Sequence, residues 1–269
     1  MSILKLAAHA RKCTRALGAL LLAGSAQAAL AADISVLSAG AIEPGIRPVL
    51  AAFEATSGHH VRLTFATAPQ IRQRIEAGAA FDVVIAPPAV LDALDALAMA
   101  SKRPADKAQR VAIGRVGVGV AVRPGAQLPD LSSAASLKRE LLAANSLVFN
   151  RASTGAHFET VLKTLGIEAQ ATAKTTRYPD GASVMEHVLN GSGRELGVGA
   201  ITEILLLRAK GLQLAGPLPP ELQNFTTYAA VAAVAAPAPA SDATVALLSH
   251  LGSAATQAGF VAAGIAPDR

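Results

Sequence analysis

Aromatic residues are scarce in this sequence. Tryptophan is absent, and all aromatic residues together make up 3% of the 269 positions. Proteins that hold unpaired bases do so largely by stacking them on aromatic rings. The composition therefore argues against a surface that stacks nucleic-acid bases or sugars.

Cysteine is nearly absent as well. The single one, Cys13, lies in an N-terminal segment with the features of a secretory signal peptide. That segment has four basic residues and no acidic residue before Asp33, a short apolar run at 16–23 and small residues suited to cleavage at 26–31. The apolar run is too short to span a bilayer. We therefore predict that residues 1–32 are removed and that the mature protein is periplasmic.

Removal of this segment takes away four cations and the cysteine, so the formal net charge falls from +5 to +1. The mature chain then has no disulfide, no thiolate metal site and no cysteine nucleophile. It also lacks the basic surface that neutralises phosphates, so we expect no nucleic-acid partner.

Catalytic and metal-binding signatures are missing too. The sequence has no Gly-x-Ser-x-Gly, no Gly-x-x-x-x-Gly-Lys and no His-Glu-x-x-His motif. Gly197 and Gly199 lack the third glycine of a dinucleotide-binding loop. The adjacent His59 and His60 have no cysteine or acidic residue at metal-ligand spacing. The sequence therefore predicts no cofactor and no metal site.

Hydrophobic residues make up 52% of the chain and are arranged as alternating strands and helices. Strands are predicted at 34–37, 61–66, 82–86, 147–150, 174–178 and 196–200. Helices are predicted at 43–53, 69–77, 88–98, 132–144, 153–165, 181–189, 202–210, 242–251 and 256–263. This order predicts an α/β fold with mostly parallel sheets and helices on both faces. Ligands of such sheets bind at the carboxyl ends of the strands.

Two long extended runs, 111–123 and 226–236, interrupt the alternation. We predict that they cross between two lobes, with lobe 1 formed by 33–113 and 229–269 and lobe 2 by 114–228. The cleft between the lobes would hold the ligand, and the C-terminal helices would pack on lobe 1. A long edge strand is the alternative for the first run.

The stretch from Ile34 to Ile46 predicts a buried strand, a turn of small residues and the start of a helix. A helix start leaves N–H donors unpaired at the positive end of the helix dipole, and such ends bind anions. An ordinary turn without a ligand is the alternative.

Four segments resemble the periplasmic solute-binding proteins of molybdate-type ABC importers. They are Val36–Ala41, Phe65–Ala79, Phe81–Ala86 and Leu196–Glu203. The resemblance implies a two-lobed class II periplasmic-binding-protein fold, in which each lobe is a mostly parallel sheet flanked by helices. It also implies a monomeric binding protein, not an enzyme, that captures a molybdate- or tungstate-like oxyanion. Its partner would be an ABC permease in the inner membrane.

The family holds its anion with hydroxyls and backbone amides from several loops. By this resemblance the ligand-binding residues are Ser38, Ala39, Thr67, Ser153, Thr154 and Ser183. Helix capping is the alternative role for these hydroxyls. The family's ligand-binding tyrosine is missing, because its place here is Ala200, or Ile201 if the register slips by one residue. Another oxyanion or a small organic anion therefore stays open as the ligand.

Two other functions also stay open. One is an exported sensor domain, which would pass ligand occupancy to a partner protein. The other is an exported enzyme on the same fold, which would need a base or nucleophile in the cleft. The candidates for that role are His157 and Glu203.

Overall fold

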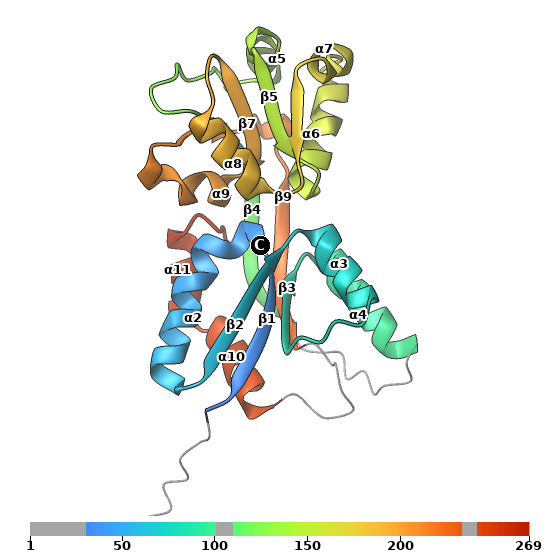
Figure 1. The fold of residues 1–269 in the computed structure, drawn as a ribbon, viewed down its shortest axis with the longest axis vertical. Coiled ribbons are helices and arrows are strands. Elements are labelled where there is room, and N and C mark those ends of the chain that lie inside the picture. Colours follow the sequence, from blue (N-terminus) through green and yellow to red (C-terminus); the bar gives the residue numbers. More distant parts are fainter. Residues whose placement is uncertain (1–30, 101–109, 233–240, 269) are drawn as a thin grey trace, which may run out of the picture. The chain divides into compact units, whose positions relative to one another are not determined.

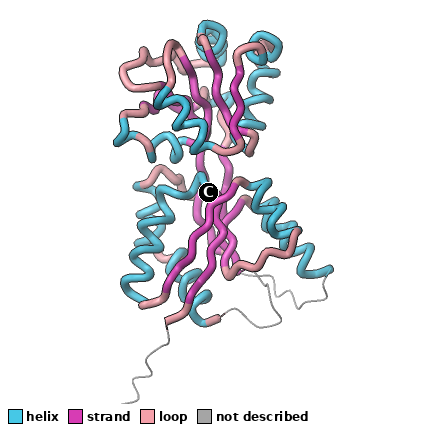
Figure 2. Tube along the Cα trace, in the orientation of Figure 1, coloured by secondary structure: helices cyan, strands magenta, loops and turns pink. Residues whose placement is uncertain are grey.

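The computed structural model describes residues 31–100, 110–232 and 241–268. The predicted signal peptide lies almost wholly outside these residues, and so does the end of the second extended run, 233–236. The described residues from Ala32 onward form one compact unit. Figure 1 shows this unit as a ribbon, and Figure 2 shows its strands lined by helices.

Lobe 1 is built around β1, which pairs in parallel with β2 and β3. The strands are β1 (Asp33–Ala39), β2 (His60–Ala66) and β3 (Val83–Ala86), and the helices after them are η1 (Gly40–Ile42) with α2 (Glu43–Ser57), α3 (Ala68–Glu76) and α4 (Pro88–Ala100). In α2 the residues Ile46, Val49, Leu50 and Phe53 are buried, as their helical spacing predicts.

Lobe 2 repeats this arrangement. Its parallel strands are β5 (Ser146–Asn150), β6 (Thr175–Tyr178) and β7 (Glu195–Ala200), and its other elements are α5 (Ala134–Ala143), α6 (Ser153–Thr164), α7 (Glu168–Thr172), α8 (Gly181–Asn190), α9 (Ile201–Leu206), η2 (Arg208–Lys210), β8 (Gln213–Pro217) and η3 (Pro220–Leu222). The sequence did not predict α7 or β8. The helix predicted at 202–210 is also too long, because α9 gives way to a 3-10 turn that ends at Gly211 with φ of 99°.

Two antiparallel strands join the lobes. They are β4 (Val111–Val122) and β9 (Phe225–Ala232). Residues 111–117 of β4 pair with β9, whereas residues 118–122 pair with β7 and β8. Because β4 takes part in both sheets, the prediction of a crossing strand is confirmed and the edge-strand alternative is wrong. In Figure 1, β4 and β9 run through the junction of the two lobes.

The C-terminal helices α10 (Asp242–Leu251) and α11 (Ala254–Ala262) pack on lobe 1, as predicted. Leu247, Leu251 and Phe260 are buried in the same hydrophobic core as β1 and β3. Among the described helices, none is long and apolar enough to cross a membrane on its own. α10 and α11 meet that test only as a pair, and they are bent by 57° relative to each other.

Candidate functional site

The strands of the two lobes point toward each other. In lobe 1, β9 is antiparallel to both β3 and β4, so β4 runs in the same direction as β1, β2 and β3. In lobe 2, β4 is antiparallel to β7 and therefore also to β5 and β6. The carboxyl ends of both sets of strands thus face the junction between the lobes (Figure 1). A cavity of about 490 Å³ lies there.

Helix starts converge on this cavity. Its wall includes the residues that precede η1, α3, α6, α8 and α9, namely Ala39, Thr67, Ala152, Asp180 and Ala200. The first N–H groups of a helix have no partner within the helix, and the helix dipole makes this end positive. The cavity is therefore suited to an anion, which those amides can bind without a buried cation.

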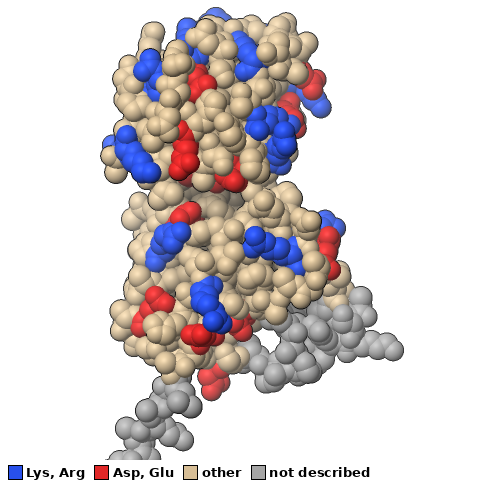
Figure 3. All heavy atoms as spheres, viewed as in Figure 1, with Lys and Arg blue, Asp and Glu red and all other residues tan. Residues whose placement is uncertain are grey.

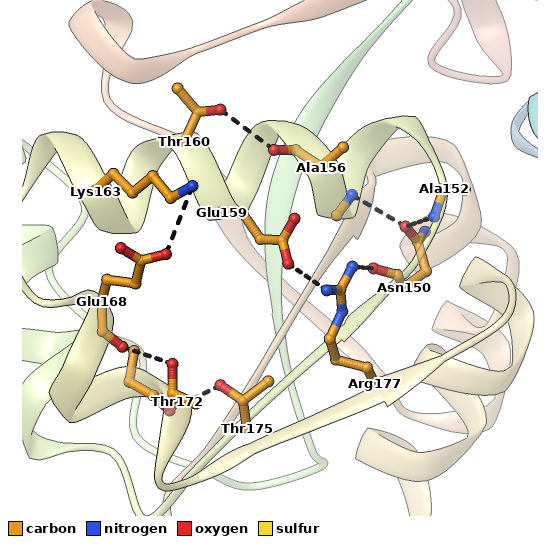
Figure 4. Close-up of polar contacts among 12 residues, drawn as sticks. Asn150, Ala152, Ala156, Glu159, Thr160, Lys163, Glu168, Thr172, Thr175 and Arg177 are labelled. Atoms are coloured by element: carbon orange, nitrogen blue, oxygen red, sulfur yellow. Dashed lines mark hydrogen bonds and ion pairs between the residues drawn. The ribbon is translucent and has the colours of Figure 1, made fainter.

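The start of α6 is held in place by Asn150 at the end of β5 (Figure 4). The Oδ1 atom of Asn150 accepts hydrogen bonds from the amides of Ala152 and Gly155, both at 3.0 Å. Its Nδ2 atom donates to the hydroxyl of Thr154 at 2.8 Å. Because that hydroxyl accepts from Asn150, its own hydrogen remains available to a ligand.

Arg177 on β6 supports this arrangement from behind. Its Nη2 atom donates to the backbone carbonyl of Asn150 at 3.2 Å, and its Nη1 atom pairs with Glu159 on α6. The guanidinium also lies 4.9 Å from the centre of the Phe149 ring. Figure 4 shows the guanidinium between Glu159 and Asn150. Arg177 thus fixes the end of β5 relative to α6 and does not itself line the cavity.

The charge of the cavity wall is acidic. Within the described part of the chain, the wall contains no lysine, arginine or histidine, but it contains Glu43, Asp180, Glu186 and Glu203. Glu43 pairs with Arg47 at 2.6 Å, and Asp180 caps α8 by accepting from the Ser183 amide at 2.8 Å. The face shown in Figure 3 carries interspersed acidic and basic residues rather than a basic surface.

Glu203 is different because its carboxyl group is buried, although the residue as a whole is partly exposed, and because it has no cationic partner among the residues that the structure describes. Its side chain turns back toward the start of α9, where its Oε2 atom accepts from the Ala200 amide at 3.4 Å. It also fills the space beside Gly181, where any larger side chain would overlap its carboxyl group. Burial raises the pKa of Glu203 to about 7, and the nearby charges of Asp180 and Glu43 act in the same direction, although the Ala200 amide lowers it.

Tyr228 on β9 brings a phenol to the same cavity. Its side chain is buried. Burial, followed by the charge of Glu203, raises the pKa of Tyr228, so the phenol stays protonated. The resemblance places a tyrosine at the position of Ala200 on β7, where this chain has none, whereas the tyrosine of this cavity lies on β9, on the other side of β4.

Five of the six predicted ligand-binding residues lie together in the cavity wall: Ala39, Thr67, Ser153, Thr154 and Ser183. Ser38 is not among the lining residues. It is fully buried within β1, and its hydroxyl donates to the Ala39 carbonyl at 3.3 Å. Of the two candidate bases, Glu203 lines the cavity, whereas His157 bonds to the Leu222 carbonyl outside it.

The polar lining residues that sequence reasoning missed include Asn150, Asp180 and Tyr228. Asn150 and Asp180 had a detectable signal, because each is a side-chain acceptor just before a predicted helix. Tyr228 had no local signal, since it lies within a strand. Among the described residues, no group of three or more histidine, cysteine or acidic side chains is arranged to hold a metal ion.

The family of bacterial extracellular solute-binding proteins matches residues 34–266. The chain belongs to this family. Among the relatives of this solute-binding protein is a Pseudomonas sp. protein named aconitate isomerase. The two are 30% identical over 250 residues, which cover 89% of this chain and 90% of the relative.

Solved structures confirm the two-lobed fold. The Azotobacter vinelandii periplasmic molybdate-binding protein gives a TM-score of 0.69 at 17% identity, over 88% of this chain and all of that one. A Geobacter sulfurreducens tungstate ABC transporter protein gives 0.62 at 12% identity, over 86% of this chain and 98% of that one. At such low identity the likeness concerns the fold alone.

Proposed function

We propose that this protein is exported to the periplasm, captures a small organic carboxylate between its lobes and delivers it to an ABC permease as a monomer. The observation that carries this proposal is the convergence of five helix starts on one cavity. Their amides can bind carboxylate oxygens in a wall that, over the described residues, has no basic side chain. Closure would come from bending of β4 and β9, the two strands that join the lobes.

The lining of the cavity favours an organic anion over molybdate. The wall has apolar side chains, including Phe65, Met185 and Leu206, which suit a carbon skeleton. The relative named for an activity on aconitate supports a carboxylate of that class.

A thermal-unfolding screen of the mature protein tests this function. The ligands are trans-aconitate, cis-aconitate, citrate, molybdate, tungstate and sulfate. A ligand at about one hundred times its Kd adds roughly 2.7 kcal/mol to the free energy of unfolding, so its Tm shift is easily measured. We expect shifts with the carboxylates. A shift with molybdate and tungstate alone would restore the oxyanion as the ligand, and no shift with any compound would reject anion capture.

Substitution of Thr154 tests the start of α6. Thr154→Ala removes one hydroxyl donor from the cavity, so we expect affinity for the carboxylate to fall about fivefold, the equivalent of about 1 kcal/mol. Thr154→Ser should retain most of the affinity. Thr160→Ala, on an exposed part of the same helix, is the matched control and should bind as the wild type does. Isothermal titration calorimetry measures all three, and an unchanged affinity in Thr154→Ala would remove this hydroxyl from the site.

A further inference from the structure

Anion capture makes no use of Glu203. Its carboxyl group lies in the cavity wall, and among the described residues its one hydrogen-bond donor is the Ala200 amide. In its ionised form it would repel an anionic ligand, and Asp180 and Glu43 add to that repulsion. A carboxyl group that disfavours the ligand and yet lies beside it points to a role in chemistry.

We propose that Glu203 is a catalytic residue, which carries a proton from one carbon to another of an unsaturated carboxylate held in the cavity and thereby isomerises it. This inference rests on the proposed function, because the carboxylate groups must first be bound by the helix starts. It adds an activity to the binding role.

The reaction is balanced without a cofactor. Ionised Glu203 takes a proton from a carbon that lies next to both a carboxylate and a carbon–carbon double bond. The C–H electron pair forms a new double bond, the original double bond shifts, and the negative charge spreads into the conjugated carboxylate. Neutral Glu203 then returns the proton to the far carbon of the same three-carbon unit. The double bond has moved, one C–H bond is broken and one is formed, and no electrons are gained or lost.

The surroundings of Glu203 suit both halves of this transfer. Because its pKa is raised to about 7, the ionised and the neutral form are both populated near neutral pH. The groups that face it are the Ala200 amide, Asp180 at the start of α8, Glu43 on α2 and the Tyr228 phenol on β9. The phenol and the helix-start amides can donate hydrogen bonds to the carboxylate on which charge develops, which lowers the barrier.

Proton NMR in D2O tests the proposal directly. The mature protein is incubated with trans-aconitate, the unsaturated probe of the binding screen, and the appearance of the cis isomer and of deuterium at carbon is followed. We expect turnover whose rate rises with pH through about 7, because the ionised form of Glu203 starts the reaction. Glu203→Gln should lose at least about a hundredfold in rate, the usual contribution of an acid–base group.

Binding measurements separate this proposal from the function on which it rests. Glu203→Gln should still show a ligand-induced Tm shift, and Glu76→Gln, an exposed acidic residue paired with Arg72, should turn over as the wild type does. Wild-type protein that binds the carboxylates but neither isomerises nor deuterates them would overturn the catalytic role and leave capture standing. Turnover by Glu203→Gln at the wild-type rate would overturn it as well. No binding of any carboxylate would reject both proposals.

Discussion

From pH 5 to pH 8, the free energy of unfolding of Glu203→Gln relative to that of the wild type is expected to rise by about 2.5 kcal/mol. The reason is the raised pKa of the buried carboxyl group, about 7 compared with an ordinary value of 4.5. Each unit of difference between the folded and unfolded states corresponds to about 1.36 kcal/mol.

The direction follows from the protonation of Glu203. Below pH 4.5 the group is neutral in both the folded and the unfolded chain and has no pH-dependent effect. As pH rises from 4.5 to 7, the unfolded chain releases the proton first, so the folded state of the wild type is progressively destabilised. Above pH 7 this cost is complete. Glutamine cannot ionise, so the variant avoids it.

Urea unfolding at pH 5 and at pH 8 measures this effect. Any pH-independent cost of burying the glutamine amide cancels when the variant-minus-wild-type free energies of unfolding at the two pH values are compared. Glu76→Gln is the control, because its exposed ion pair with Arg72 contributes only a few tenths of a kcal/mol. If Glu203→Gln and the wild type differed in free energy of unfolding by the same amount at pH 5 and at pH 8, the carboxyl group would not be buried in a low-dielectric site. A stability gain together with lost turnover would identify a strained functional group.

Gly155→Ala is expected to destabilise the protein by about 2–3 kcal/mol and to weaken carboxylate binding by at least tenfold. A methyl group at this position would overlap the backbone carbonyl of Asn150, so the main chain has to move. The Gly155 amide also donates to Oδ1 of Asn150 at 3.0 Å. The shift would therefore displace the start of α6, where Ser153 and Thr154 line the cavity.

Gly259→Ala is the matched control for this variant. Gly259 also lies within a helix, α11, but the nearest side-chain atom to an added methyl group is the Val49 Cγ2 atom, 4.0 Å away. Alanine is the better helix former, so this variant should be stabilised by up to about 1 kcal/mol. Thermal unfolding and calorimetric titration of both variants test the pair. If Gly155→Ala and Gly259→Ala were equal in stability and in affinity, the main chain at the junction of β5 and α6 would tolerate movement.

Most of the helices and strands of this protein could be predicted from its sequence, although α7 and β8 could not. The helix predicted at 242–251 has the same bounds as α10, and β5 and β7 lie within one residue of their predicted ranges. These elements were predictable because side-chain spacing of two or of three to four residues, together with the caps, is a local property. Thr67 and Ser153 were named as site residues by the resemblance to the molybdate-type family, and the structure places both in the cavity wall.

Which of these residues meet at one cavity depends on how the elements assemble. Ser38 and Ala39 are neighbours in the sequence, but successive side chains of a strand point to opposite faces, and β1 pairs on both edges, so Ser38 is buried away from the cavity wall. Tyr228 reaches the cavity only because β9 pairs with β3 and β4, which are more than a hundred residues away in the chain. Glu203 looks like an ordinary helix-start acid in the sequence. It becomes a buried carboxyl group because α8, α2 and β9 close around it, and burial among packed elements is a property of the assembled fold rather than of any segment.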